Sequence, residues 1–170
     1  MIKLPPLPPG WIKGGDARGG GMVVGEAPWR EEKRLKRPFV GPAGMCLRGA
    51  FTLVGLDVEE LWLTNVVKVQ PRGRNPNRTE INQGLGYLGK EIRYVAPTCI
   101  LALGGTAYET LTGGRLSMGE ARKIEHALDP QFGYGDAVVL ATWHPIHVMR
   151  FGAADVPQWK DDLDAFRQRI

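Results

Sequence analysis

Apolar runs typical of β-strands alternate with segments of helical periodicity along most of this chain, and this alternation constrains the fold more than any other feature. The strand-like runs are 22–25, 61–67, 99–103 and 137–142. The helix-like segments are 43–55, 79–95, 106–112 and 155–170. Crossover helices cover both faces of a parallel sheet. We therefore expect a three-layer α/β/α sandwich with a central, mainly parallel four-stranded sheet.

The helix over 79–95 has the clearest pattern. Thr79 offers a hydroxyl cap at its start. Its apolar residues recur at intervals of three or four: Ile81, Leu85, Leu88 and Ile92. This spacing predicts one face packed against the sheet.

The segment 1–21 is rich in proline and then in glycine, which predicts an arm rather than a core element. We expect Leu4, Leu7 and Trp11 to pack this arm onto one domain comprising residues 22–170. No stretch approaches the roughly 20 apolar residues that cross a bilayer. We therefore expect a cytoplasmic, nucleoid-associated monomer without a membrane partner.

Functional residues of such sheets gather where the strands end, which directs attention to four loops. The first contains Gly-Glu-Ala-Pro-Trp at 25–29 and Pro-Phe-Val-Gly-Pro-Ala-Gly at 38–44. The others contain Thr-Asn-Val-Val-Lys at 64–68, Leu-Gly-Gly-Thr-Ala at 103–107 and Thr-Trp-His-Pro at 142–145. Singly, each has an ordinary interpretation, such as a connection, an asparagine cap or a structural histidine. A glycine turn before a helix also suits a phosphate.

Together, and in this order, the motifs resemble those of the uracil-DNA glycosylases, most closely the family IV type. The resemblance covers roughly residues 22–165. It implies an enzyme that flips uracil out of single- or double-stranded DNA, hydrolyses its N-glycosidic bond and leaves an abasic site for base excision repair. The formal net charge of +4 and the pI near 9.2 suit such a polyanionic partner.

The resemblance also assigns roles in a pocket for the flipped base. Phe39 would stack on uracil, and Asn65 would hydrogen-bond its edge, because an amide offers both a donor and an acceptor. His144 would donate a hydrogen bond to O2 of uracil and stabilise the departing anion, as in an oxyanion hole.

The turn after the first strand would supply the remaining pocket residues. Glu26 is the favoured residue for positioning water and stabilising the cationic sugar, and Glu32 is a second catalytic candidate. Either glutamate could instead be solvated, and Glu32 could close the pocket. Ala27 and Trp29 would contact the base.

Further residues would contact the DNA around the flipped nucleotide. Val148 and Met149 are expected to enter the duplex as apolar wedges, with Arg150 on a phosphate. The alternative for these three is a packed helical turn. Phosphate contacts are also expected from the glycine turn and from the basic stretch 68–78, which could otherwise be a solvated loop. The residues concerned are Gly104, Gly105, Thr106, Arg72 and Arg74.

The chain departs from the family IV pattern at its cysteines. That family generally carries an iron–sulfur cluster on four cysteines, two near the N-terminus and two after the asparagine strand. This chain has only Cys46 and Cys99, which we expect to be buried free thiols. Val69 and Gly84 stand at the later cysteine positions. We therefore predict no cluster, no other cofactor and no metal site.

Two further departures bear on the substrate. Trp29 stands where family IV usually has glycine, and Ile146 stands where a serine is common. The bulk of Trp29 could exclude the methyl group of thymine or stack on a modified base. Two alternatives therefore stay open: a glycosylase for another deaminated or modified base, and a non-catalytic DNA- or protein-binding module.

Overall fold

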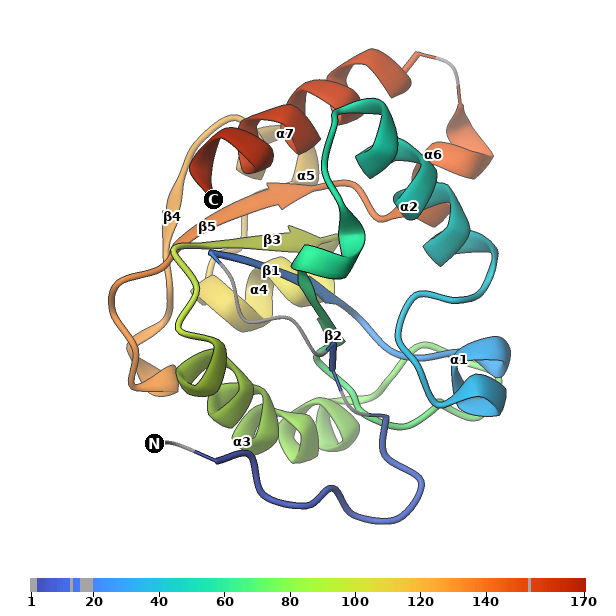
Figure 1. Ribbon diagram of the computed structural model, residues 1–170, viewed down its shortest axis with the longest axis vertical. Coiled ribbons are helices and arrows are strands. Elements are labelled where there is room, and N and C mark those ends of the chain that lie inside the picture. Colours follow the sequence, from blue (N-terminus) through green and yellow to red (C-terminus); the bar gives the residue numbers. More distant parts are fainter. Residues whose placement is uncertain (1–2, 13, 16–19, 153) are drawn as a thin grey trace.

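The computed structural model describes residues 3–12, 14–15, 20–152 and 154–170. In this part of the chain, five strands form one sheet in the order β2-β1-β3-β5-β4 (Figure 1). Four strands are parallel: β1 (Gly21–Gly25), β2 (Trp62–Asn65), β3 (Cys99–Leu103) and β5 (Val138–Thr142). The fifth, β4 (His126–Ala127), runs antiparallel to β5 at the sheet edge. The expected mainly parallel sheet is thus confirmed, with one additional strand.

Helices cover both faces of the sheet, which confirms the three-layer α/β/α arrangement (Figure 1). One face carries α2 (Pro42–Leu53), α6 (Pro145–Phe151) and α7 (Val156–Arg169). The other carries α3 (Arg78–Val95), α4 (Gly105–Thr112) and α5 (Met118–Ala121). Three short elements complete the described chain: α1 (Arg30–Leu35), η1 (Val58–Glu60) and η2 (Pro130–Phe132).

The strands divide their side chains between two core clusters, because successive residues of a strand point to opposite faces. Met22 and Val24 of β1 pack in the cluster that contains Leu88 and Ile92 of α3. Val23 packs in the other cluster, beside residues of α2 and α7. Both clusters consist of buried residues, so the sheet is a rigid base for the loops at its edge.

The cap of α3 differs from expectation. The helix begins at Arg78, and its cap is Asn77 rather than Thr79. The Asn77 side chain accepts a hydrogen bond from the backbone N–H of Glu80 at 2.9 Å, and the Glu80 carboxylate accepts from the N–H of Asn77 at 2.8 Å. This reciprocal capping box satisfies two backbone donors, which a cap at Thr79 would not achieve.

The described part of the arm follows α3 (Figure 1). The ring of Trp11 meets the ring of Tyr87 edge-on at a centroid distance of 6.2 Å. The Tyr87 hydroxyl donates to the carbonyl of Pro5 at 3.3 Å, and the N–H of Ile12 donates to the carbonyl of Lys68 at 2.8 Å. Residues 1–2, 13 and 16–19 of the expected arm lie outside the described residues, and Gly21 already belongs to β1.

Candidate functional site

Four loops follow the carboxyl ends of β1, β2, β3 and β5. Because these strands are parallel, all four loops leave the sheet on the same side, which we call the loop edge. Gly25 of β1 pairs with Asn65 of β2, and Leu103 of β3 pairs with Thr142 of β5. The N–H of Val67 also donates to the carbonyl of Glu26 at 2.9 Å, which ties the second loop to the first. In Figure 1 this edge faces α1 and the start of α6.

The side chains of Phe39 and Asn65 meet at the end of β1. A Cβ atom at Gly25 would lie 2.7 Å from Cζ of Phe39 and 2.6 Å from Oδ1 of Asn65. Any side chain at position 25 would therefore displace one of them. Both residues are almost buried, with exposed fractions of 5% for Phe39 and 6% for Asn65. The two residues expected to grip the base are thus neighbours.

The backbone at Phe39 is strained, with φ of 53° in the left-handed region. Such a conformation costs about 1–3 kcal/mol for a residue other than glycine. Two contacts hold it: Arg48 Nε donates to the Phe39 carbonyl at 3.0 Å, and Gly44 packs directly on Phe39. A Cβ at Gly44 would lie 2.1 Å from the carbonyl carbon of Phe39, so α2 can approach this loop only through glycine.

The carboxylate of Glu32 braces the same loop from the inside. It accepts hydrogen bonds from the backbone N–H groups of Trp29, Val40 and Gly41 at 3.2, 3.1 and 2.8 Å. Only 8% of Glu32 is exposed, so it is not solvated. These three donors commit its oxygens to the loop backbone, which indicates a positioning role rather than contact with reacting atoms.

His144 is the N-cap of α6 and is held as a neutral imidazole. Its Nδ1 accepts a hydrogen bond from the N–H of Ile146 at 3.2 Å, which places the ring proton on Nε2. Burial lowers the pKa of His144 to about 4. The glycine turn passes close to the start of this side chain: a Cβ at Gly104 would lie 3.2 Å from Cβ of His144, and the N–H of Gly104 donates to the carbonyl of Thr142 at 2.8 Å.

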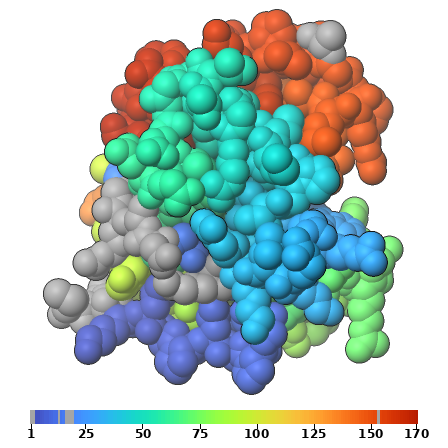
Figure 2. Space-filling model, turned by 45° about the vertical axis from the view of Figure 1, so that its right-hand side comes forward, coloured from blue at the N-terminus to red at the C-terminus, as the bar shows by residue number. Residues whose placement is uncertain are grey.

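A cleft of about 610 Å³ opens in front of His144. Phe39 and Asn65 are not among the residues that line it. The lining does combine eight other residues expected at the site: Glu26, Ala27, Trp29, Gly104, Gly105, Thr106, His144 and Arg150. Figure 2 shows the molecule hollowed at its right-hand margin, between α6 in orange and the green segment that precedes α3. The Thr106 hydroxyl donates to the Glu26 carboxylate at 2.5 Å, so one loop orients the glutamate of another.

Lys68 supports Asn65 from beneath, a contact that the sequence analysis missed. Its ammonium lies 2.5 Å from the carbonyl oxygen of Asn65, 2.5 Å from a carboxylate oxygen of Glu91 and 2.7 Å from the Thr64 hydroxyl. Lys68 is 2% exposed, so it cannot contact the DNA backbone as part of the basic stretch. Burial lowers the pKa of Lys68, although the Glu91 carboxylate favours its charged form.

A second network anchors the chain just before His144. The Thr142 hydroxyl donates to Asp162 at 2.5 Å, and Arg122 grips the same carboxylate through Nε at 2.9 Å and Nη2 at 2.7 Å. The Arg122 guanidinium also lies 4.6 Å from the ring centroid of Trp143. Burial raises the pKa of Asp162, and its hydrogen bonds oppose that shift.

The expected DNA contacts on α6 separate into buried and exposed residues. Val148 is 5% exposed and packs in the core cluster with α2 and α7, so we do not retain it as a wedge. Met149 is 51% exposed, and Arg150 lines the cleft without an ion pair to any described residue. Phe151, which the sequence analysis did not single out, is 69% exposed and also lines the cleft.

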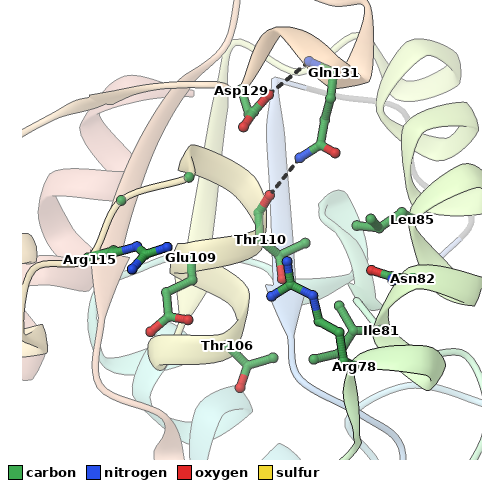
Figure 3. Close-up of a pocket in the computed structure, with 12 residues that line it drawn as sticks. Arg78, Ile81, Asn82, Leu85, Thr106, Glu109, Thr110, Arg115, Asp129 and Gln131 are labelled. Atoms are coloured by element: carbon green, nitrogen blue, oxygen red, sulfur yellow. Dashed lines mark hydrogen bonds between the residues drawn. The ribbon is translucent and has the colours of Figure 1, made fainter.

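A second hollow of about 550 Å³ lies between α3 and α4 (Figure 3), and the glycines that line it are Gly113 and Gly114 rather than Gly104 and Gly105. Thr106 and Glu109 line both hollows, and Arg78 lines this one. Arg74, by contrast, is paired with Glu80 at 2.8 and 3.1 Å. Arg72 is exposed in the basic stretch 68–78.

The fold and the cleft define an α/β protein whose loops at the carboxyl ends of four parallel strands bring polar side chains together, with Glu26, Thr106 and His144 lining one cleft. The model of the Uracil DNA glycosylase superfamily matches residues 12–165, and the chain belongs to this superfamily.

Several relatives carry the description type-4 uracil-DNA glycosylase. The protein from Pyrobaculum aerophilum is 43% identical over 53% of this chain and 46% of its own length. The protein from Thermotoga maritima is 33% identical over 76% of this chain and 66% of its own length. The protein from Saccharolobus solfataricus is 32% identical over 77% and 62%. The matches thus cover between about half and two thirds of these relatives.

The residues present do not fit the iron–sulfur cluster that the family IV resemblance implies. The chain has only two cysteines. Cys99 packs in the hydrophobic core on the face of the sheet that carries α2 and α7, whereas Val69 packs against the hydrophobic core on the opposite face. Burial raises the pKa of Cys99 to about 12. A Cβ at Gly84 would lie 2.0 Å from the carbonyl oxygen of Val66. Among the described residues, no group of three or more histidines, cysteines or carboxylates could hold a metal ion.

Within the described ranges, no helix is long and apolar enough to cross a membrane.

Proposed function

We propose that this protein is a uracil-DNA glycosylase, which hydrolyses the N-glycosidic bond of a flipped-out uracil and leaves an abasic site. One observation carries the proposal. A neutral imidazole, whose Nδ1 is already bonded to the backbone, shares a cleft with a carboxylate oriented by Thr106. The Nε2–H of His144 is then available as a donor, and Glu26 as an acceptor.

The charge on the departing base explains the use of His144. As the bond between C1′ of the sugar and N1 of uracil breaks, its electron pair moves onto the base and spreads to O2. An N–H donor fixed near O2 stabilises this anion more than the neutral base, which lowers the barrier. The proton belongs on Nε2 because Nδ1 accepts from Ile146. Since burial lowers the pKa of His144 to about 4, this donor is present throughout the neutral range.

Glu26 supplies the acceptor for the water. The sugar gains positive character at C1′, and a carboxylate stabilises that charge while it orients the attacking water. The water oxygen bonds to C1′, and its released proton passes to the carboxylate and then to solvent. The Thr106 hydroxyl keeps the carboxylate in place.

The remaining pocket residues recognise the base. Phe39 stacks on it, and the Asn65 amide pairs with O4 and N3–H, the donor and acceptor pattern of the uracil edge. Glu32 positions Phe39 through the N–H groups of the two following residues, and Lys68 positions Asn65 through its carbonyl oxygen. Trp29, 38% exposed on the cleft wall, excludes a 5-methyl group by its bulk.

DNA is the proposed partner of the cleft. Its backbone phosphates would lie near Arg150, Arg72 and the turn at Gly104 and Gly105. Met149 remains the proposed apolar wedge. We propose that the protein works as a monomer in the cytoplasm, at the nucleoid.

Oligonucleotides that carry one uracil, thymine, hypoxanthine or hydroxymethyluracil test the proposal. The protein is incubated with single and double strands in a chelator, and alkali then cleaves any abasic site. We expect cleavage at uracil alone. His144→Ala and Asn65→Ala should each slow it by two or more decades, roughly the effect of losing one oxyanion contact. His126→Ala is the matched control, because His126 lies on β4 and does not line the cleft.

Near-normal rates for His144→Ala and Asn65→Ala would overturn the site assignment. Cleavage at hydroxymethyluracil or hypoxanthine instead of uracil would replace the substrate and assign Trp29 a stacking role. Binding of DNA without any cleavage would favour a non-catalytic module.

A further inference from the structure

We propose that Phe151 is a stacking platform for a nucleobase that flanks the extruded uracil on the same strand. This inference rests on the proposed function, because it requires a DNA strand in the cleft. It names a contact beyond the base pocket and beyond the wedge.

The first argument is a column of planar groups that ends at Phe151. The rings of Trp143 and His147 are stacked, with centroids 5.7 Å apart and planes 10° apart. The rings of His147 and Phe151 follow at 4.9 Å and 45°. The three residues are spaced by four, so the last two lie one above the other on α6. Arg122 lies beneath Trp143 at 4.6 Å and begins the column.

The second argument is that the column is anchored everywhere except at its end. Arg122 is fixed by Asp162, and the Trp143 carbonyl accepts a hydrogen bond from Nε1 of Trp159 at 3.2 Å. The imidazole of His147 lies 3.1 Å from the Asp155 carboxylate. Phe151, by contrast, is 69% exposed. A large ring supported from behind and open to solvent presents a preorganised apolar surface.

The third argument identifies the occupant. His147 and Phe151 line the same cleft as His144 and Glu26, and Arg150 stands between them in sequence as an unpaired cation among the described residues. An aromatic surface beside a free arginine is the combination that binds single-stranded nucleic acid, since each base has a flat face and each linkage a phosphate. A nucleobase therefore fits this position.

The geometry also separates this base from the extruded one. Phe39 and Asn65 meet at the end of β1 and are almost buried. Phe151 lies at the far end of α6, seven residues after His144, which corresponds to about 10 Å along the helix axis. This distance exceeds the width of a pyrimidine ring, so Phe151 reaches a neighbouring nucleotide.

Three substitutions at Phe151 test the proposal. Phe151→Ala removes the ring, Phe151→Leu keeps an apolar wedge without an aromatic face, and Phe151→Trp keeps the face. Leu53→Ala is the control, because Leu53 is an exposed apolar residue at the end of α2 and does not line the cleft. Thermal melting checks that each variant is folded. We expect all of them to fold, because the substituted side chains are exposed.

The main measurement is the affinity for a single strand that holds a non-hydrolysable uracil nucleotide, with 2-aminopurine at successive flanking positions. We expect the fluorescence of 2-aminopurine to be quenched at one flanking position, where the base stacks on Phe151. Phe151→Ala and Phe151→Leu should both lose this quenching and bind at least about fivefold more weakly, as for the loss of one stacked base. Phe151→Trp should retain both. In cleavage assays KM should rise while kcat under saturating DNA stays near wild type.

The outcomes separate this inference from the proposed function. Unchanged affinity in Phe151→Ala, or equal binding by the Leu and Trp variants, would overturn the stacking role while uracil cleavage stands. If the wild type never cleaves uracil but still quenches the probe in a Phe151-dependent way, the enzymatic proposal fails and the stacking surface remains.

Discussion

Acidification from pH 7 to pH 5 should destabilise this protein by about 2 kcal/mol through His144 alone. Burial lowers the pKa of His144 to about 4, whereas an unfolded imidazole titrates near 6.5. Between these values the unfolded chain binds more protons than the folded one, so stability falls as the pH falls. The contribution is complete above about pH 6.5, and about 3 kcal/mol is lost once the pH passes below the folded pKa near 4.

Urea unfolding at the two pH values measures this loss. The free energy of unfolding is compared between the wild type and His144→Gln, because other titrating groups cancel in the difference. The variant should be less sensitive to acid by about 2 kcal/mol. His147→Gln separates the contribution of the other imidazole that lines the cleft. Nitrogen NMR of the ring gives the proton position directly, and we expect it on Nε2.

Equal acid sensitivity of the wild type and His144→Gln would refute the reasoning. An imidazole that titrates near 6.5 in the folded protein would do the same. Either result would also remove the basis for a neutral donor in the proposed reaction, since the ring would then be charged at mildly acidic pH.

Further predictions concern the loop that carries Phe39. Gly44→Ala should destabilise the protein by about 3 kcal/mol in urea unfolding, because its Cβ would overlap Phe39. Its control, Gly49→Ala in the same helix, meets no atom within 4 Å and should gain about 0.5–1 kcal/mol. Glu32→Gln should lose about 1–3 kcal/mol, because an amide cannot accept all three N–H groups; an unchanged midpoint would contradict the brace. Trp29→Gly should cleave thymine-containing oligonucleotides at least about tenfold faster relative to uracil, as expected when a methyl group no longer clashes.

The regular part of the fold could be predicted from local patterns. The run 99–103 coincides with β3, and the periodic segment 79–95 differs from α3 by one residue. These elements are buried on a defined face, so their sequences carry a strong period. The two-residue strand β4 has too few residues for any period, and the capping box at Asn77 lies just outside the apolar pattern.

The candidate site could be predicted at the level of motifs but not of contacts. Residues such as Glu26 and His144 stand next to strand ends, and the parallel sheet brings those ends to one edge. Which polar side chains face inward depends on tertiary contacts. The burial of Lys68 beneath Asn65 and the three N–H donors on Glu32 follow from segments distant in the chain. The sequence did carry one usable signal for the burial of Lys68. This lysine directly follows the Asn-Val-Val run, which continues an apolar strand.

The contacts of Lys68 also suggest how this chain holds together a region that family IV generally cross-links through cysteines. Those cysteines lie near the N-terminus, after the asparagine strand and in the segment that forms α3. Here the Glu91 carboxylate of α3 binds the ammonium of Lys68 after β2 and, at 3.2 Å, the N–H of Gly14 from the arm. A buried ion pair is weak evidence for net stability, but removing one partner is costly. The same three segments are therefore joined by charge and hydrogen bonds. Because α3 then packs on the carbonyl of Val66, position 84 has room for a glycine and none for a thiol.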